Sequence, residues 1–254
     1  FNADGGSAVA SSIYATYGQD YGDLPTTTKD GYTFVGWFTA AEGGTEVTNT
    51  TICKQTADHN LYAHWTANNY TIYLHENTGV DKTSAINVTY GETYTLTAPA
   101  ERTGYTFAGW FTKQEGGDLY DLTSRTYETV GDLHLYAHWT AVSDITVSFN
   151  ADGGSAVASS IYATYGQAYG ELPTTSKDGY TFVGWFNADG NIVASTDICR
   201  NATSHTLTAH WKAKAFTITF DANGGECHTT NKQVVYNTAI GKLPLVTRDG
   251  YKFN

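Results

Sequence analysis

All six tryptophans of this chain fall into one pattern that recurs three times. Three of them lie in the motif Gly-Trp-Phe and the other three lie in Ala-His-Trp. The Gly-Trp-Phe copies are 73 and then 75 residues apart (37 to 110 to 185). A fixed period of this size predicts a tandem array in which each repeat is one structural unit. We expect the tryptophans to form the cores of these units; they are Trp37, Trp65, Trp110, Trp139, Trp185 and Trp211.

The period divides the chain into four repeats. Repeat 1 covers residues 1–68 and lacks most of its first strand, repeat 2 covers 69–142, repeat 3 covers 143–213, and repeat 4 is a partial copy at 214–254. Residues 1–38 and 149–186 differ at only three positions, which indicates duplication of a module. The chain contains no Met and begins and ends within repeats, so we expect a longer parent protein.

Composition excludes several classes of protein. Aromatic residues make up 14% of the chain, too many for a disordered segment. The formal net charge of −11 argues against binding to nucleic acid, which requires clustered Lys and Arg. No apolar stretch approaches 18 residues, so we expect no membrane insertion in this segment.

Apolar and polar side chains alternate within each repeat, as in β-strands that have one buried face and one solvent-exposed face. In repeat 3, Leu207, Ala209 and Trp211 share one face of the closing strand, and Thr208 and His210 share the other. Asp-Gly and Gly-Gly turn signals recur at fixed offsets, and the only candidate for a helical turn is at residues 21–24 and its counterpart in repeat 3. The fold is therefore expected to be mostly β, with small α+β units. The linkers at 66–69, 140–143 and 212–215 are short, which predicts semi-rigid beads on a string.

The order of the motifs resembles a known family. It runs Phe-x-Ala-x-Gly-Gly, Tyr-Gly, Leu-Pro, Gly-Tyr-x-Phe-x-Gly-Trp-Phe and Leu-Tyr-Ala-His-Trp, and is similar to the Listeria–Bacteroides repeat, the B-repeat of internalin-type surface proteins. The resemblance covers essentially the whole chain. It implies a β-grasp, ubiquitin-like fold and a place in secreted or cell-surface proteins, and it brings no catalytic residues. Repeat 2 departs from the pattern at residues 74–79 and 96–99, so its first hairpin is expected to differ.

Candidate chemistry in the repeats is sparse. Histidines recur near the closing strand, but no Cys or carboxylate recurs with them, so we predict outward-facing side chains and no metal site. Residues 221–226 begin like a calcium loop, yet position 12 of that loop is Lys232 where a bidentate Glu is needed. Neither a nucleophile elbow nor a phosphate loop occurs, so we predict no enzyme and no cofactor. The recurring histidines are His59, His64, His134, His138, His205 and His210.

Three cysteines and four sequons are candidate modification sites. Cys53 and Cys199 occupy matching positions in repeats 1 and 3, and Cys227 follows the Gly-Gly turn of repeat 4. One hypothesis is a disulfide that joins Cys199 to Cys227 or one chain to another; the alternative, favoured for Cys53 and Cys199, is a buried free thiol. Glycosylation sequons begin at Asn49, Asn69, Asn87 and Asn201.

These observations favour a non-enzymatic, extracellular repeat region of a bacterial cell-surface protein. It would serve as the stalk of an adhesin or as the shaft of a filament, with neighbouring repeats or other copies of itself as partners. The alternative is an adhesion module that contacts host protein or glycan through repeated exposed Tyr and His faces. The tyrosines considered for such a face are Tyr14, Tyr17, Tyr21, Tyr62, Tyr136, Tyr162, Tyr165 and Tyr169.

Overall fold

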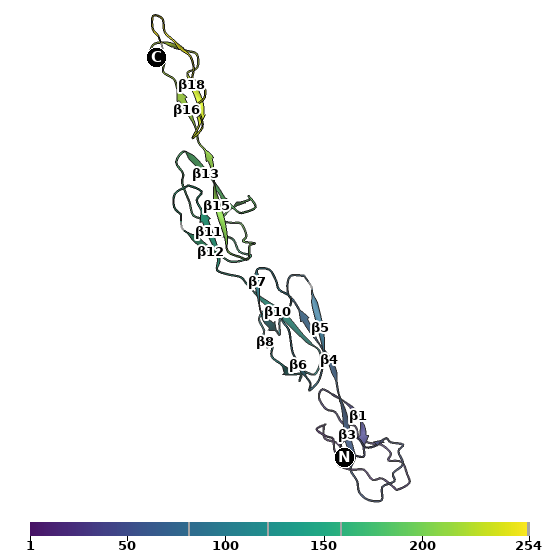
Figure 1. The fold of residues 1–254 in the computed structure, drawn as a ribbon. Coiled ribbons are helices and arrows are strands. Elements are labelled where there is room, and N and C mark those ends of the chain that lie inside the picture. Colours follow the sequence, from purple (N-terminus) through teal and green to yellow (C-terminus); the bar gives the residue numbers. More distant parts are fainter. Residues whose placement is uncertain (81, 121, 158, 253–254) are drawn as a thin grey trace. The chain divides into compact units, whose positions relative to one another are not determined.

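The computed structural model describes residues 1–80, 82–120, 122–157 and 159–252. The chain divides into two compact units: Phe1–Glu101 with Phe107–Trp139, and Arg102–Thr106 with Thr140–Asn254. Throughout the described residues every regular element is a strand, as the ribbon in Figure 1 shows. The prediction of small β domains in tandem is confirmed, whereas the β-grasp assignment stays a prediction.

Repeat 3 shows the complete sheet most clearly. Five strands lie in the order β12-β11-β15-β13-β14, and the central pair β11–β15 is parallel while every other pair is antiparallel. One face of this sheet carries the core, in which Val147, Leu207 and Ala209 are fully buried. The predicted apolar face of the closing strand is therefore confirmed. The bounds are β11 (Ile145–Asn150), β12 (Ser160–Ala163), β13 (Tyr180–Phe186), β14 (Ile192–Val193) and β15 (His205–Ala213).

Repeat 2 builds the same sheet in the order β5-β4-β10-β7-β8, with β4–β10 as the parallel pair. Its first hairpin differs from that of repeat 3, as expected, because β5 has seven residues where β12 has four. A short antiparallel pair, β6–β9, lies outside the main sheet. The bounds are β4 (Asn69–His75), β5 (Thr83–Thr89), β6 (Thr93–Tyr94), β7 (Tyr105–Phe111), β8 (Leu119–Tyr120), β9 (Arg125–Thr126) and β10 (Leu133–Ala141).

Repeats 1 and 4 hold parts of this sheet. Repeat 1 forms the three-stranded sheet β2-β1-β3, and repeat 4 forms two separate antiparallel pairs, β16–β18 and β17–β19. Repeat 1 has a core of its own, but none of the described residues of repeat 4 is buried. The bounds are β1 (Tyr32–Phe38), β2 (Glu46–Val47), β3 (Tyr62–Ala67), β16 (Ala215–Thr219), β17 (Glu226–Cys227), β18 (Asn231–Val235) and β19 (Val246–Thr247).

The helical turn expected at residues 21–24 does not form. Gly22 has a φ of +69°, outside the right-handed helical region. The N–H groups of Tyr21 and Gly22 donate to the carbonyls of Thr51 and Asn49, so these donors are paired across the loop and a helix is not needed to satisfy them. Repeat 3 repeats the arrangement, with a φ of +77° at Gly170.

Each tryptophan lies on a sheet strand and donates a hydrogen bond to a loop. Trp37, Trp110 and Trp185 are buried, and each donates its indole N–H to a backbone carbonyl 12 or 13 residues earlier in the chain, at 2.7–3.0 Å. The tryptophans of Ala-His-Trp are half-buried and donate to carbonyls near the start of their repeats at 2.8–3.1 Å. A buried indole N–H requires such an acceptor, so these bonds fix both loops of the unit.

Candidate functional site: the junctions between repeats

The most regular feature beyond the individual repeats is the contact where one repeat meets the next. At each boundary, a Gly-Tyr turn of one repeat packs against a tyrosine of the following repeat. The first junction lies inside the first unit, and the other two lie inside the second unit. The three Gly and Tyr pairs are Gly31 with Tyr90, Gly104 with Tyr165, and Gly179 with Tyr236.

Glycine is required at these turns for two reasons. Gly104 has a φ of +80°, which side-chain-bearing residues rarely adopt. In addition, a Cβ atom built on Gly104 would lie 2.3 Å from the ring of Tyr165, so the tyrosine occupies the space that any other side chain would need. The same 2.3 Å separation occurs at Gly31 and at Gly179.

The linker residue is bonded to both repeats. At the first junction, the N–H of Asn68 donates to the carbonyl of Gly31, and the carbonyl of Asn68 accepts from the N–H of Tyr90, both at 2.9 Å. Val142 and Lys214 make the same two bonds at the other junctions, at 2.8–2.9 Å. The sequence predicted short linkers between semi-rigid beads, and in the structure the backbone of each linker is hydrogen-bonded to both repeats.

Aromatic and cationic side chains complete each junction. The tyrosine after the glycine meets the partner tyrosine edge-to-face, with ring centroids 5.4–5.5 Å apart at 74–76°. A cation from the same turn lies over the first ring: Lys29 at 4.8 Å from Tyr32, Arg102 at 4.0 Å from Tyr105, and Lys177 at 5.0 Å from Tyr180. Edge-to-face rings and cation–π contacts each stabilise such a site by about 0.5–1.5 kcal/mol.

The recurring histidines lie mainly within the sheets and their adjoining loops. His64, His138 and His210 each stack flat on the Phe of Gly-Trp-Phe, with centroids 3.9 Å apart, a pairing that the sequence analysis missed. His59 and His205 bond the hydroxyls of Tyr21 and Tyr169 at 2.7 and 3.0 Å. Within the part of the chain that the structure describes, no three His, Cys, Asp or Glu side chains gather as metal ligands.

Two tyrosines beside these histidines have altered acidity. Burial, reinforced by the neighbouring Cys53, raises the pKa of Tyr21 to about 12. Burial, reinforced by Cys199, likewise raises the pKa of Tyr169 to about 12. Both phenols therefore stay neutral at physiological pH and serve as hydrogen-bonding groups, because burial penalises the phenolate.

The candidate modification sites fall in different environments. Cys53 and Cys199 are buried free thiols in separate repeats, and Cys227 is a partly exposed free thiol whose Sγ lies 2.9 Å from the carbonyl oxygen of Thr229. The disulfide and glycosylation assignments stay predictions. All four sequon asparagines are exposed, namely Asn49, Asn69, Asn87 and Asn201.

The segment 221–226, which begins like a calcium loop, forms a turn. The side-chain oxygen Oδ1 of Asp221 accepts a hydrogen bond from the N–H of Asn223 at 2.8 Å, as is usual for Asp in a turn.

The tyrosines considered for a binding face do not share one environment. Tyr21 is in a core, and Tyr165 belongs to a junction. Tyr14, Tyr17 and Tyr162 are exposed. The remaining three are partly buried: Tyr62, Tyr136 and Tyr169.

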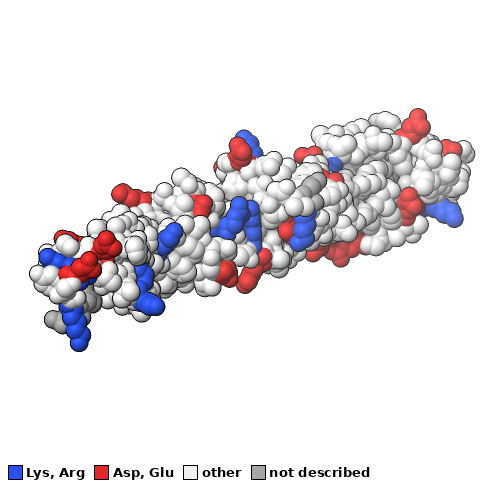
Figure 2. All heavy atoms as spheres, turned by 90° about the horizontal axis from the view of Figure 1, so that it is seen from above, with Lys and Arg blue, Asp and Glu red and all other residues white. Residues whose placement is uncertain are grey.

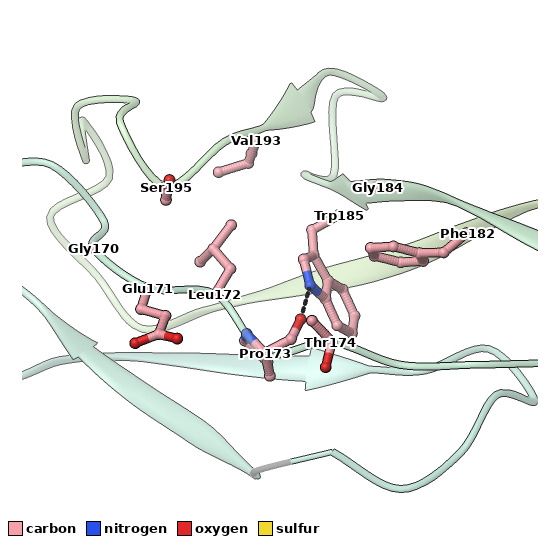
Figure 3. A pocket seen from close by; sticks show the side chains of 10 residues that line it. All are labelled: Gly170, Glu171, Leu172, Pro173, Thr174, Phe182, Gly184, Trp185, Val193 and Ser195. Atoms are coloured by element: carbon pink, nitrogen blue, oxygen red, sulfur yellow. Dashed lines mark hydrogen bonds between the residues drawn. The ribbon is translucent and has the colours of Figure 1, made fainter.

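Repeat 3 also contains a hollow of about 590 Å³. It is lined by Leu172, Val193 and the edge of Trp185, whose N–H is already bonded to the carbonyl of Pro173 (Figure 3). Its only ionisable lining residue, Glu171, points away from Val193 (Figure 3). The lining thus offers apolar packing without a converging set of polar groups.

Charge does not single out a binding surface either. Acidic and basic side chains are mixed over the visible face in Figure 2, and neither sign forms a continuous patch there. Within the residues that the structure describes, no helix is long and apolar enough to span a membrane.

The fold and the junctions together define a tandem β-repeat protein. The sequence matches the Listeria-Bacteroides repeat domain four times, over residues 1–64, 70–138, 146–210 and 216–254. The chain therefore belongs to the Listeria-Bacteroides repeat family.

Three similar proteins place this repeat in larger chains. A protein of Evansella cellulosilytica named as a Gly-rich membrane protein is 33% identical over 208 residues, which is 80% of this chain and 23% of that protein. A second protein of that organism, also named as a membrane protein, is 30% identical over the whole chain and 38% of its own length. Internalin H of Listeria monocytogenes is 35% identical over 44% of this chain and 20% of that protein. The chain thus spans well under half of each relative.

Proposed function

We propose that this chain is a non-enzymatic repeat region of a bacterial cell-surface protein, and that it acts as a stalk. The observation that carries the proposal is the junction, because the same Gly-Tyr contact and the same two backbone bonds occur at all three boundaries. A stalk needs units that join in one way, whatever their individual sequences. The names of the relatives, two membrane proteins and an internalin, support a place at the cell surface.

The junction supplies the mechanical property that a stalk requires. A linker of a few residues without side-chain contacts bends freely, whereas a linker residue bonded on both sides beside two packed rings resists bending. Each added repeat then extends the region by a set amount. The net charge of −11 disfavours collapse of one repeat onto another.

The alternative is an adhesion module that contacts host protein or glycan. Such a module needs the same exposed side chains in every unit, but Tyr62 and Tyr136 are replaced by Thr208 in repeat 3. The difference favours the stalk. A third form of the proposal, the shaft of a filament, requires other copies of this chain as partners.

The test is to change the number of repeats in the full chain. Chains carrying one or two further copies of residues 69–142 are compared by small-angle X-ray scattering. A stalk predicts equal increments in the maximum dimension for each added repeat. Unequal increments, or saturable binding to host glycans that grows with repeat number, contradict it, and fibres wider than one repeat in electron micrographs indicate the filament.

A matched variant ties the result to the junction. Replacing Gly104 with Val removes the space that Tyr165 occupies, so the scattering curve is expected to show a broader distribution of dimensions. Gly116→Val is the control, because Gly116 also has a positive φ but has no atom within 4 Å of the added Cβ.

A further inference from the structure

Two histidines and two tyrosines form a cluster on the outer face of the sheet in repeat 2. A role as a stalk does not require this cluster. The parallel register of β4 and β10 places His134 opposite Tyr73 and Tyr136 opposite His75. His75 and His134 are 59 residues apart in sequence, yet His75 Nε2 lies 3.0 Å from His134 Nδ1. Their rings are nearly parallel, with an interplanar angle of 17° and centroids 5.3 Å apart.

Both imidazoles pack against neighbouring side chains. Tyr73 stacks on His134 at 4.7 Å, and Tyr136 stacks on His75 at 4.6 Å. The Nδ1 atom of His75 bonds the hydroxyl of Thr83 at 2.9 Å. When Nδ1 carries the hydrogen of that bond, the lone pair of His75 lies on Nε2, the atom that faces His134. His134 is exposed and His75 is half-buried, so solvent reaches the pair.

The cluster is specific to repeat 2 and is not needed to build the sheet. Repeat 3 forms the same five-stranded order without it. The registers of the two parallel pairs show which residues correspond. Small polar residues stand at all four positions of repeat 3, which are Ser148, Asn150, Thr206 and Thr208.

We propose that His75 and His134 form a two-histidine site for a divalent transition-metal ion, with Cu²⁺ bound most tightly. Imidazole nitrogens suit Cu²⁺, Ni²⁺ and Zn²⁺, and Cu²⁺ leads that series in affinity. Two nitrogens bound to one ion at about 2.0–2.1 Å and at right angles lie about 2.9 Å apart. The observed 3.0 Å matches neighbouring positions of a tetragonal site better than the wider spacing of a tetrahedral one.

The chemistry of binding balances simply. In the free site His134 donates its Nδ1 hydrogen to His75 Nε2. When the ion binds both of these nitrogens, His134 carries its hydrogen on Nε2, the rings turn so that their lone pairs converge, and the neutral pair releases no net proton. Protonation of either imidazole removes a ligand nitrogen, so the affinity for the ion falls as the pH is lowered.

The experiment is a titration of the full chain with Cu²⁺, with the α-amino group acetylated so that it does not bind the ion. Calorimetry is expected to show one high-affinity equivalent, and electron paramagnetic resonance is expected to show two nitrogen ligands. His134→Gln should lower the affinity at least tenfold. His138→Gln is the control, because His138 lies on the same strand but stacks on Phe111 and bonds the carbonyl of Lys113.

A gain of the site tests the geometry separately from any loss of folding. Placing the four residues of repeat 2 into repeat 3 (Ser148→Tyr, Asn150→His, Thr206→His and Thr208→Tyr) should raise the stoichiometry from one ion to two. Equal affinity in the His134→Gln variant, or an unchanged stoichiometry in a folded four-residue variant, overturns the proposal. Scattering by the stalk is independent of these outcomes.

Discussion

Repeats 1 and 3 have almost the same sequence over 38 aligned positions, but they do not have the same structure. In repeat 3, Ser160–Ala163 forms β12 against β11. In repeat 1, the matching residues 12–15 form no strand, and none of the described strands pairs with them. Strand formation in this segment is therefore decided by the partner strand, because its own residues are the same.

Repeat 1 also has a groove. This hollow of about 610 Å³ is lined by residues 11–15 and 55–61. Its walls keep the arrangement of repeat 3, because Asn2 bridges Tyr62 in parallel as Asn150 pairs with Thr208. Ala15 is exposed, whereas its counterpart Ala163 is only 4% exposed.

The largest expected effect of this difference is on a charge placed at the paired alanines. Ala163→Asp buries a carboxylate in the core of repeat 3 and should lower the free energy of unfolding by about 3 kcal/mol or more. Ala15→Asp should change it by less than about 0.5 kcal/mol, because the side chain stays in water. Urea unfolding of the two variants checks both values; equal losses would contradict the structural difference.

A smaller effect is expected for the paired tyrosines. Tyr165→Ala removes the ring that packs on Gly104 and should cost about 1–3 kcal/mol. Its counterpart Tyr17 is 65% exposed, so Tyr17→Ala should be nearly neutral. Thermal unfolding monitored by tryptophan fluorescence distinguishes them, and a costly Tyr17→Ala would show a contact that this structure lacks.

The paired cysteines should differ in reactivity and only slightly in stability. Cys53 is only 2% exposed but borders the groove of repeat 1, whereas Cys199 is 0% exposed in the core of repeat 3. Alkylation of the native chain should therefore be several-fold faster at Cys53 than at Cys199, with the partly exposed Cys227 fastest. Mass spectrometry of timed samples gives the order, and equal rates at Cys53 and Cys199 would mean that the groove is closed in solution.

The stability of repeats 1 and 3 should depend in the same way on alkaline pH. The pKa values of Tyr21 and Tyr169 are raised from 10 to about 12 in the folded chain, so folding favours the neutral phenols. The resulting stability is complete below pH 10 and is lost as the pH rises toward 12. Absorbance near 295 nm should show both tyrosines ionising about two pH units late, and Tyr21→Phe and Tyr169→Phe should each remove one late-titrating group. Ionisation of either near pH 10 contradicts its burial.

The features that could be predicted from the sequence are those that depend on residues adjacent in the chain. Alternation gave the buried face of Leu207 and Ala209 correctly, and the turn signals marked the ends of the strands, because both follow from period-two geometry and φ preferences. The helical turn at residues 21–24 was wrong, because its backbone donors are taken by residues 49–51. Residues 12–15 and 160–163 have the same sequence, yet only 160–163 form a strand, because a strand needs a paired neighbour and residue propensity contains no information about that neighbour.

The junctions and the histidine pair were missed for a related reason. Gly104 and Tyr165 meet across a repeat boundary, and His75 meets His134 only because β4 and β10 run parallel. No local pattern joins such residues. The recurrence of Gly-Tyr and Tyr-Gly at fixed offsets was the available signal for the junction, since residues that recur without a role inside a unit are candidates for a role between units.

The uniformity of the junction has a genetic consequence. Gly31, Gly104 and Gly179 present the same surface, and Asn68, Val142 and Lys214 use only backbone atoms to bridge it. An in-frame exchange between two equivalent positions, for example one that removes residues 68–213, still brings a Gly-Tyr turn against a tyrosine, here Gly31 against Tyr236. Unequal recombination can therefore shorten or lengthen the coding sequence by whole repeats without leaving a mismatched boundary.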